Sequence, residues 1–200
     1  MTPEQTTPQA DGRPLFIVGC VRSGTTMTRD LLRRVPNFIC PEETHIFRWA
    51  EPFHTPASQR TFANNKVLDS HREIDGVTHA DYRRIAETSR SKKEFQLRYI
   101  TAVARAKGIT GPYRWFEKTP QNIFGAALMA QEFPKARFLH LVRNPLNVVA
   151  SLIAGRQMSV PDLDGACNYW LESVMQAKSL RSPYPNRVLN MRYEDLISDA

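Results

Sequence analysis

Residues 19–26 have the residue types and the spacing of an anion-binding loop. They read Gly-Cys-Val-Arg-Ser-Gly-Thr-Thr, with Gly19 and Gly24 spaced as in the nucleotide-binding P-loop. In a P-loop, backbone N–H groups and a helix N-terminus hold phosphate. Thr25 replaces the P-loop lysine, but Arg22 supplies a cation whose planar guanidinium can hold two anionic oxygens. The segment therefore predicts a site for a phosphate-like anion, against the plainer interpretation of a turn with an exposed arginine.

The elements around this loop predict an α/β fold. Residues 15–19 form a short apolar run, which is typical of a strand buried on both faces. Residues 24–35 carry apolar side chains at helical spacing, and Pro36 ends that run. Further strands are predicted at residues 114–117, 137–142 and 187–193, and further helices at 123–133, from Pro145 onwards and at 165–180. This alternation indicates a P-loop-like three-layer fold with a central, mainly parallel sheet, whose strand-end loops share one edge.

The chain is expected to form one domain. Residues 1–13 are polar and are expected to be a disordered lead-in, whereas residues 14–200 contain the strand and helix patterns. Residues 49–111 lack the alternation of strand and helix patterns. They are expected to be a helical insert, with a basic helical stretch at 81–107. The last residues have a helical pattern with no stop signal, so we expect the domain to be incomplete at its C-terminus.

Arg143 and Ser151 form a second candidate anion site. Arg143 follows a predicted strand, Asn144 is a favourable helix N-cap and Pro145 a favourable first helical residue, so Arg143 is expected beside a positive helix terminus. Taken alone, this block would be a surface arginine followed by a serine that fills a helix. However, it lies at a second strand end, far along the chain from Arg22, and two such blocks at strand ends are hard to explain by chance.

These two blocks resemble the binding motifs of sulfotransferases that use 3′-phosphoadenosine 5′-phosphosulfate (PAPS). Residues 16–26 are similar to the family's 5′-phosphosulfate loop, with Val21 where the family usually has proline. The segment from Arg143 to Ser151 is similar to its 3′-phosphate motif, and residues 192–196 resemble its final-strand ending. The resemblance implies that PAPS is the sulfuryl donor and that it is bound by Arg22, Ser23, Gly24, Thr25, Thr26, Arg143 and Ser151.

The resemblance also implies catalytic cations. Lys118 directly follows a predicted strand and resembles the family's catalytic lysine, which neutralises charge on the bridging oxygen of the leaving group. Sulfuryl transfer shares the demands of phosphoryl transfer, so positioning and positive charge supply most of the catalysis. Arg22 is the second candidate for that charge. A surface lysine is the alternative interpretation of Lys118.

A carboxylate or histidine near the loop is needed to take the proton of an acceptor hydroxyl. Residues 41–45, Pro-Glu-Glu-Thr-His, offer Glu42, Glu43 and His45. This segment is similar to the glutamate motif of tyrosylprotein sulfotransferases, the nearest type in motif pattern, which implies Glu43 as the general base. Glu42, His45 and an ordinary solvated turn stay open as alternatives. The acceptor is expected to be a tyrosyl peptide, a carbohydrate or a small molecule that carries a hydroxyl group.

Composition leaves two other functions to weigh. The chain has 27 Lys+Arg and 20 Asp+Glu, a net charge of +7, which favours an anionic partner. Replacement of the P-loop lysine by Thr25 disfavours a kinase or ATPase, and no motif with interleaved aromatic residues supports a basic nucleic-acid-binding protein.

The remaining composition bears on metals and on the compartment. The three cysteines match no zinc spacing, and no metal is predicted. No apolar run approaches the roughly 20 residues of a membrane span, and the polar N-terminus is unlike a secretory signal. We therefore expect a cytoplasmic protein with neither nucleic acid nor membrane as its partner.

Overall fold

A parallel sheet forms the centre of the computed structural model, which describes residues 9–48, 51–56, 58, 65–155, 160 and 162–198. Its main strands lie in the order β4-β2-β5-β6. Their bounds are Leu15–Gly19 for β2, Pro112–Lys118 for β4, Arg137–Val142 for β5 and Val188–Arg192 for β6. Because β2 lies between β4 and β5, the strand order reverses beside β2. Sheets of this kind bind ligands in the crevice at the carboxyl ends of the strands at such a point.

Two short strands extend the sheet. The strands β1 (Gln9–Ala10) and β3 (Phe38–Ile39) both pair with β4, in parallel like the other described pairs. The lead-in expected to be disordered over residues 1–13 is therefore structured from residue 9, and residues 1–8 lie outside the described residues. Two bonds help to hold this segment: Asp11 N–H donates to the Tyr113 carbonyl (2.9 Å), and Trp115 Nε1–H donates to the Asp11 carbonyl (3.1 Å).

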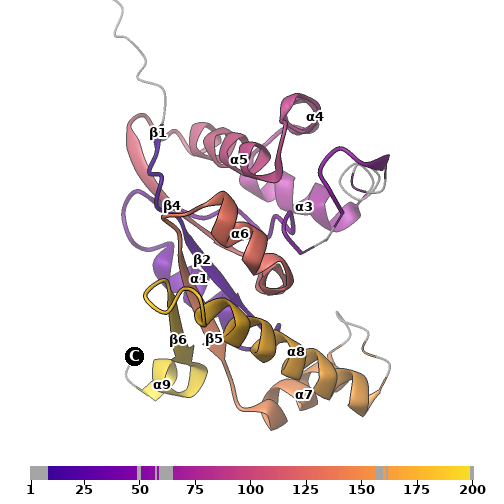
Figure 1. Cartoon of the computed structure of the whole chain (residues 1–200). Coiled ribbons are helices and arrows are strands. Elements are labelled where there is room, and N and C mark those ends of the chain that lie inside the picture. The colour runs from indigo at the N-terminus through magenta and orange to yellow at the C-terminus, as the bar shows by residue number, and fades with distance from the viewer. Residues whose placement is uncertain are drawn as a thin grey trace, which may run out of the picture.

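Helices cover both faces of the sheet, which confirms the three-layer α/β fold (Figure 1). Phe16 and Val18 of β2 belong to the core that includes side chains of α6 (Ala126–Glu132) and α8 (Leu163–Arg181). Ile17, between them, faces the opposite side, where Leu32 of α1 (Thr25–Leu32) packs. α7 (Pro145–Ala154) lies beside α8.

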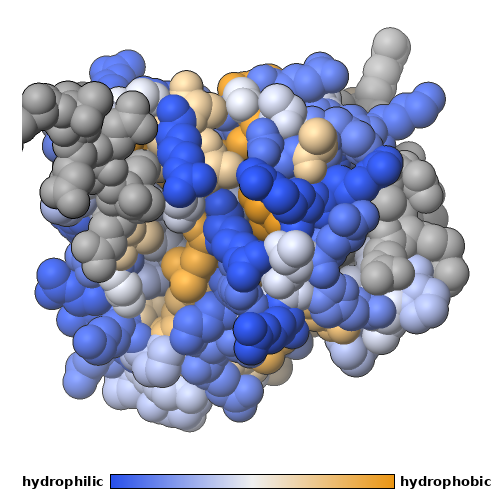
Figure 2. Space-filling view, turned by 90° about the horizontal axis from the view of Figure 1, so that it is seen from above, coloured by the Kyte–Doolittle hydropathy of each residue, from blue (hydrophilic) through white to orange (hydrophobic). Residues whose placement is uncertain are grey.

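The described part of the expected insert is helical. It contains α3 (Lys66–Asp75), α4 (His79–Thr88) and α5 (Lys92–Ala106), and their apolar side chains join the same core as Phe16. The prediction of a single helical stretch at 81–107 is wrong, because the helix is interrupted at residues 89–91. There the Ser91 side chain caps α5 by accepting a hydrogen bond from Glu94 N–H. Viewed from the side of α4 and α5, the surface is largely hydrophilic with apolar residues between the charged ones (Figure 2).

Other boundaries differ from expectation by a few residues. α1 ends at Leu32 because the next turns are of the tighter i→i−3 type, and Pro36 disfavours helix at the residue before it. The helix expected at 123–133 begins instead as the 3₁₀ helix η1 (Pro120–Gly125) before continuing into α6. The final strand ends at Arg192, where α9 (Tyr193–Ser198) begins. Within the described residues, helices with both the length and the apolar character to span a membrane are absent.

Candidate active site

Segments that follow five parallel strands meet at one edge of the sheet. They carry Arg22 after β2, Glu43 after β3, Lys118 at the end of β4, Arg143 after β5 and Tyr193 after β6. A cleft of about 1030 Å³ opens at this edge. Among the residues predicted for the site, its wall includes Arg22, Thr25, Thr26, Glu43 and Ser151. The alternative base His45 also lines it, as do Arg48, His71 and Gln121, which the sequence did not point to.

The loop between β2 and α1 has the backbone conformation that its glycines allow. Gly24 lies in the left-handed region (φ 90°) and is the N-cap of α1, so it offers no capping side chain. Arg22 also has a positive φ of 69°. The first turn of α1 has no acidic residue, so its free N–H groups and the positive end of the helix dipole face the loop without a built-in counter-charge.

Ser23 adds a polar group without a partner at the same place. Its side chain is completely buried, and its Oγ has no hydrogen-bond partner among the described residues. Buried polar atoms of this kind are usually satisfied, so an orphaned hydroxyl beside an uncapped helix start suits an anion that would accept hydrogen bonds there. The loop therefore fits the sulfate or phosphate end of a nucleotide donor.

The two predicted anion blocks come together. The Arg22 guanidinium donates from Nε to Ser151 Oγ at 2.8 Å, and Arg143 donates from Nη1 to the Arg22 carbonyl at 3.1 Å. The expected N-cap is confirmed, since the Asn144 side chain accepts from Leu146 N–H at 2.9 Å. Arg143 does not line the cleft itself, and its buried Nε has no partner in the part of the chain that the structure describes.

Tyr193 connects the loop to Arg143. The Arg143 guanidinium lies over the Tyr193 ring, 4.4 Å from its centroid, a distance typical of a cation–π contact. Gly24 packs against the same ring so closely that a Cβ atom would lie 2.2 Å from Tyr193 Cδ2. Tyr193 is a residue whose part in the site the sequence analysis missed, although it recognised residues 192–196 as a strand ending.

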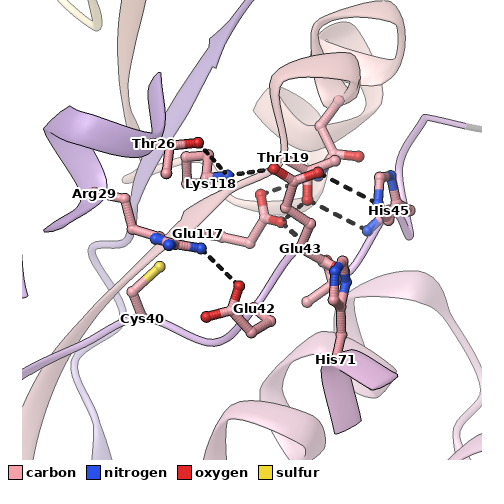
Figure 3. Close-up of polar contacts among 12 residues, drawn as sticks. Thr26, Arg29, Cys40, Glu42, Glu43, His45, His71, Glu117, Lys118 and Thr119 are labelled. Atoms are coloured by element: carbon pink, nitrogen blue, oxygen red, sulfur yellow. Dashed lines mark hydrogen bonds and ion pairs between the residues drawn. The ribbon is translucent and has the colours of Figure 1, made fainter. Parts of the chain in front are cut away.

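Glu43 and Lys118 form an ion pair at the wall of the cleft. Lys118 Nζ donates to Glu43 Oε1 and lies 3.4 Å from Thr26 Oγ1, in the first turn of α1 (Figure 3). The Lys118 side chain is only 2% exposed, which removes the interpretation of a surface lysine, whereas Glu43 is 25% exposed and faces the cleft. The structure thus brings a carboxylate and an ammonium group together beside the anion loop.

The comparison with protein families decides what this arrangement belongs to. The model described as the sulfotransferase family matches residues 14–200. The chain belongs to the sulfotransferase family. It is therefore an enzyme of sulfuryl transfer, and the family generally uses PAPS as donor and hydroxyl-bearing acceptors. No protein with a curated description matches the chain.

Solved structures of sulfotransferases share the fold of this one. The sulfotransferase domain of the Synechococcus olefin synthase is 20% identical with a TM-score of 0.73, and the match covers 100% of this chain and 71% of that one. The sulfotransferase domain from the curacin biosynthetic pathway is 19% identical with a TM-score of 0.65, covering 95% and 70%. A Mycobacterium avium sulfotransferase is 17% identical with a TM-score of 0.58, covering 94% and 60%.

Of the three candidate bases in this sulfotransferase, Glu42 is not among the residues that line the cleft. Its carboxylate forms ion pairs with Arg29 (2.6 Å) and Arg33 (2.8 Å). Burial alone would raise the pKa of Glu42, but the hydrogen bond and charge of Arg33, with the charge of Arg29, outweigh it and hold that pKa below its ordinary value. Glu42 thus has a structural role in the ion pairs with Arg29 and Arg33.

His45 lines the cleft but is a weak base. Burial lowers the pKa of His45 to about 4, against the opposing effect of the Glu43 carboxylate. The ring is therefore neutral at pH 7. A base is most effective when its pKa lies near the working pH, so a histidine with this pKa takes a proton poorly.

A buried network that the sequence analysis missed holds the segment with Glu43. Glu117 is fully buried at the end of β4, and burial raises its pKa, partly offset by bonds from Thr119, Asn122 and Thr44. Asn122 Nδ2 donates to Glu117 Oε2 at 3.0 Å, and Thr44 Oγ1 donates to Glu117 Oε1 at 3.1 Å. A charged residue directly after the apolar pair Trp115-Phe116 was the signal in the sequence.

The backbone of residues 42–47 is bound largely by side chains from elsewhere. Asp75, at the end of α3, accepts from Glu42 N–H at 3.0 Å, and Thr119 Oγ1 accepts from His45 N–H at 3.3 Å. Asn122 Oδ1 accepts from Phe47 N–H at 3.2 Å. Because these partners come from α3 and from the segment after β4, the position of Glu43 is fixed relative to both elements.

Proposed function

We propose that this sulfotransferase transfers a sulfuryl group from PAPS to an acceptor hydroxyl, with Glu43 as general base and with Lys118 and Arg22 as catalytic cations. One observation carries the proposal: the Glu43–Lys118 ion pair lies against Thr26, in the first turn of the helix that the anion loop starts. A proton acceptor and a buried cation thus face the site where an anionic donor would bind.

Hydrogen-bond donors without partners and a nearby cation support the donor site. The orphaned Ser23 hydroxyl and the free N–H groups at residues 24–26 would hold the sulfate end, and Arg22 would add charge. Arg143 and Ser151 would hold the 3′-phosphate, and both reach the loop through Arg22. The positive charge in the proposal comes from the side chains of Arg22, Lys118 and Arg143.

The chemistry divides between Glu43 and the cations. Bound PAPS supplies the sulfuryl group and an anionic leaving group. The Glu43 carboxylate takes the acceptor's hydroxyl proton as that oxygen bonds to sulfur. Lys118 and Arg22 stabilise the negative charge that grows where the sulfur–oxygen bond to the nucleotide breaks, and they do so in a partly buried site where charge interactions are stronger than in water.

The acceptor carries a hydroxyl group in this proposal. The similarity of residues 41–45 to the tyrosylprotein type supports a tyrosyl peptide, and a carbohydrate or a small molecule would present the same hydroxyl chemistry. A cytoplasmic location fits the three cysteines, which are all free thiols.

Ligand-dependent thermal stability tests the donor class. The nucleotide product 3′-phosphoadenosine 5′-phosphate should raise the melting temperature, because a ligand at 100 times its Kd stabilises the folded state by about 2.7 kcal/mol. ATP with Mg²⁺ and an oligonucleotide serve as comparisons. A larger rise with ATP would support the kinase or ATPase alternative, and one with the oligonucleotide would support nucleic-acid binding.

Transfer itself is tested with PAPS labelled in the sulfuryl group and a panel of phenols, tyrosyl peptides, sugars and alcohols. We expect label to move to at least one acceptor class, and we expect the rate of this transfer to fall by about a hundredfold or more in the Glu43→Gln enzyme. If the Glu43→Gln enzyme transferred label at the wild-type rate, Glu43 would not be the base.

A further inference from the structure

We infer that His45 is a positioning residue, which donates a hydrogen bond from Nε2–H to Glu43 Oε2 and so fixes the orientation of that carboxylate. This inference rests on the proposed function, since it concerns the base of that reaction. The two atoms lie 3.4 Å apart, and Figure 3 shows the Glu43 carboxylate between Lys118 on one side and His45 on the other.

The position of the ring proton follows from Arg48. Arg48 Nη1 lies 3.4 Å from His45 Nδ1. A guanidinium group has only donors, so Nδ1 must be the acceptor in this contact. A neutral imidazole carries its single ring proton on the other nitrogen, which is Nε2, the atom that faces Glu43.

The ring is held in this orientation from several sides. Its side chain is only 9% exposed, and it stacks on the His71 ring with 6.0 Å between centroids and 11° between planes. Thr119 Oγ1 accepts the His45 backbone N–H at 3.3 Å. His71 in turn donates from Nδ1 to the Glu43 carbonyl at 2.9 Å, so both histidines bind the Glu43 residue, but only His45 faces its carboxylate.

Burial is the main reason that His45 is neutral. Burial lowers the pKa of His45 to about 4, the Glu43 carboxylate opposes this shift, and the positive charges of Arg48 and Lys118 lower the pKa further. The described charged and titratable groups around Glu43 include Lys118 on β4, His71 on α3 and His45 in its own segment, which contact it, and Arg48 and Tyr169, which interact with it electrostatically. His45 therefore donates a hydrogen bond without adding a charge.

The two oxygens of the carboxylate have separate partners. Lys118 binds Oε1 and His45 faces Oε2, and each oxygen keeps a further lone pair that can accept a proton. If Lys118 turns toward the leaving group during transfer, His45 remains to orient Glu43. Removal of the donor on His45 should therefore affect the base more than the binding of nucleotide.

Two variants separate this role from a packing role. His45→Phe keeps a ring but has no donor, and His45→Gln places an amide N–H near the position of Nε2. In His45→Phe we expect kcat to fall about tenfold and the acid limb of the pH–rate profile to move up by about one pH unit, because a hydrogen bond to the carboxylate form is lost. His45→Gln should recover most of both, and the Kd of 3′-phosphoadenosine 5′-phosphate should stay within about twofold in all enzymes.

The control is His79→Gln, which changes an exposed histidine at the start of α4. It should leave the acid limb in place. Equal losses in His45→Phe and His45→Gln with no movement of the acid limb would overturn the inference, and so would full activity in His45→Phe. If the wild-type enzyme transferred no sulfuryl group, the proposed function would fail instead.

A measurement without turnover tests the same geometry. Nitrogen NMR of the histidine rings, with His45→Phe used to assign the signal, should show His45 neutral and protonated on Nε2 from pH 8 to pH 5. A proton on Nδ1, or titration near the ordinary pKa of a histidine, would contradict the inference whether or not the acceptor is known.

Discussion

Arg22 donates a hydrogen bond to Ser151 across 129 residues of sequence, with 2.8 Å between Nε and Oγ. The first residue was predicted to bind the 5′ end of the donor and the second its 3′-phosphate. Their direct contact means that the two proposed anion sites form one connected group, to which Arg143 adds its bond to the Arg22 carbonyl. Loss of Ser151 should therefore weaken binding of the 3′-phosphate most and binding of the 5′ end to a smaller extent, through Arg22.

Ser151→Ala tests this connection through affinity. It should weaken the binding of 3′-phosphoadenosine 5′-phosphate by about tenfold or more, because a hydrogen bond to a charged group contributes about 1.5–3 kcal/mol. The affinity for adenosine 5′-phosphate, which lacks the 3′-phosphate, should fall less. Calorimetry measures both affinities. The exposed serine Ser198 gives the control variant Ser198→Ala. Equal losses for both nucleotides would remove Ser151 from the 3′-phosphate site.

Glu43→Gln should lower kcat by about a hundredfold or more, since general base catalysis contributes about 10²–10⁴-fold. Nucleotide affinity should change little, because Glu43 is proposed to act on the acceptor. Steady-state kinetics and calorimetry on the same preparation give both quantities. A loss of nucleotide binding as large as the loss of kcat would contradict this role.

The matched variant Glu42→Gln should behave differently. It breaks ion pairs with Arg29 and Arg33, in which the Glu42 side chain is only 12% exposed. We expect the free energy of unfolding to fall by about 1–3 kcal/mol, and the folded enzyme to keep a kcat far above that of Glu43→Gln. Denaturant unfolding measures the first quantity, and a hundredfold loss of kcat in Glu42→Gln would reverse the assignment of the base.

Gly24→Ala should destabilise the protein and abolish nucleotide binding. The added Cβ would meet the Tyr193 ring at 2.2 Å, and the residue would keep a left-handed φ of 90°. Gly108→Ala is the matched control, because its φ is 71° but the space around its Cβ is open. Left-handed backbone alone costs about 1–2 kcal/mol, so the unfolding free energy of Gly24→Ala should fall clearly further. Equal losses in the two variants would show that the ring contact is unimportant.

Stability should decrease as the pH falls from about 6.5 to 4, and His45 should account for part of the decrease. The pKa of His45 is about 4 in the folded protein against an ordinary value of 6.5, so the unfolded chain binds a proton first. Above pH 6.5 both states are neutral at this residue. Below it, folding loses up to about 3 kcal/mol from this one group.

Urea unfolding at pH 7.5 and pH 4.5 measures this linkage. The loss of stability between the two values should be smaller by about 2–3 kcal/mol in His45→Gln than in the wild type, while His79→Gln should follow the wild type. The same pH dependence in wild type and His45→Gln would show that His45 titrates normally.

The sequence predicted the parts of the site that depend on strand ends. Arg22, Lys118 and Arg143 each follow a strand with a clear apolar pattern, and a parallel sheet brings such ends to one edge whatever their distance in sequence. The spacing of Gly19 and Gly24 predicted the loop for the same local reason. The mainly parallel sheet and the three layers followed from the alternation of elements, whereas the order of the strands came only from the structure.

The parts that sequence could not supply depend on contacts between distant side chains. β1 and β3 have two residues each, too few for any periodicity to show. The break between α4 and α5 depends on capping by Ser91 against an otherwise helical pattern. The pairing of Glu43 with Lys118 follows from the register of β3 beside β4, which no local pattern encodes.

The contact between Gly24 and Tyr193 also bears on when the site can form during synthesis of the chain. A ribosome releases residues 9–142 first, and these contain the strands β2, β4 and β5 that seat the anion loop. The ring that closes over Gly24 and supports Arg143 arrives only after β6, near the end of the described chain. A nascent chain that stops before residue 193 thus has the loop without the ring that packs against Gly24 and supports Arg143, so the loop can reach its final packing only late in synthesis.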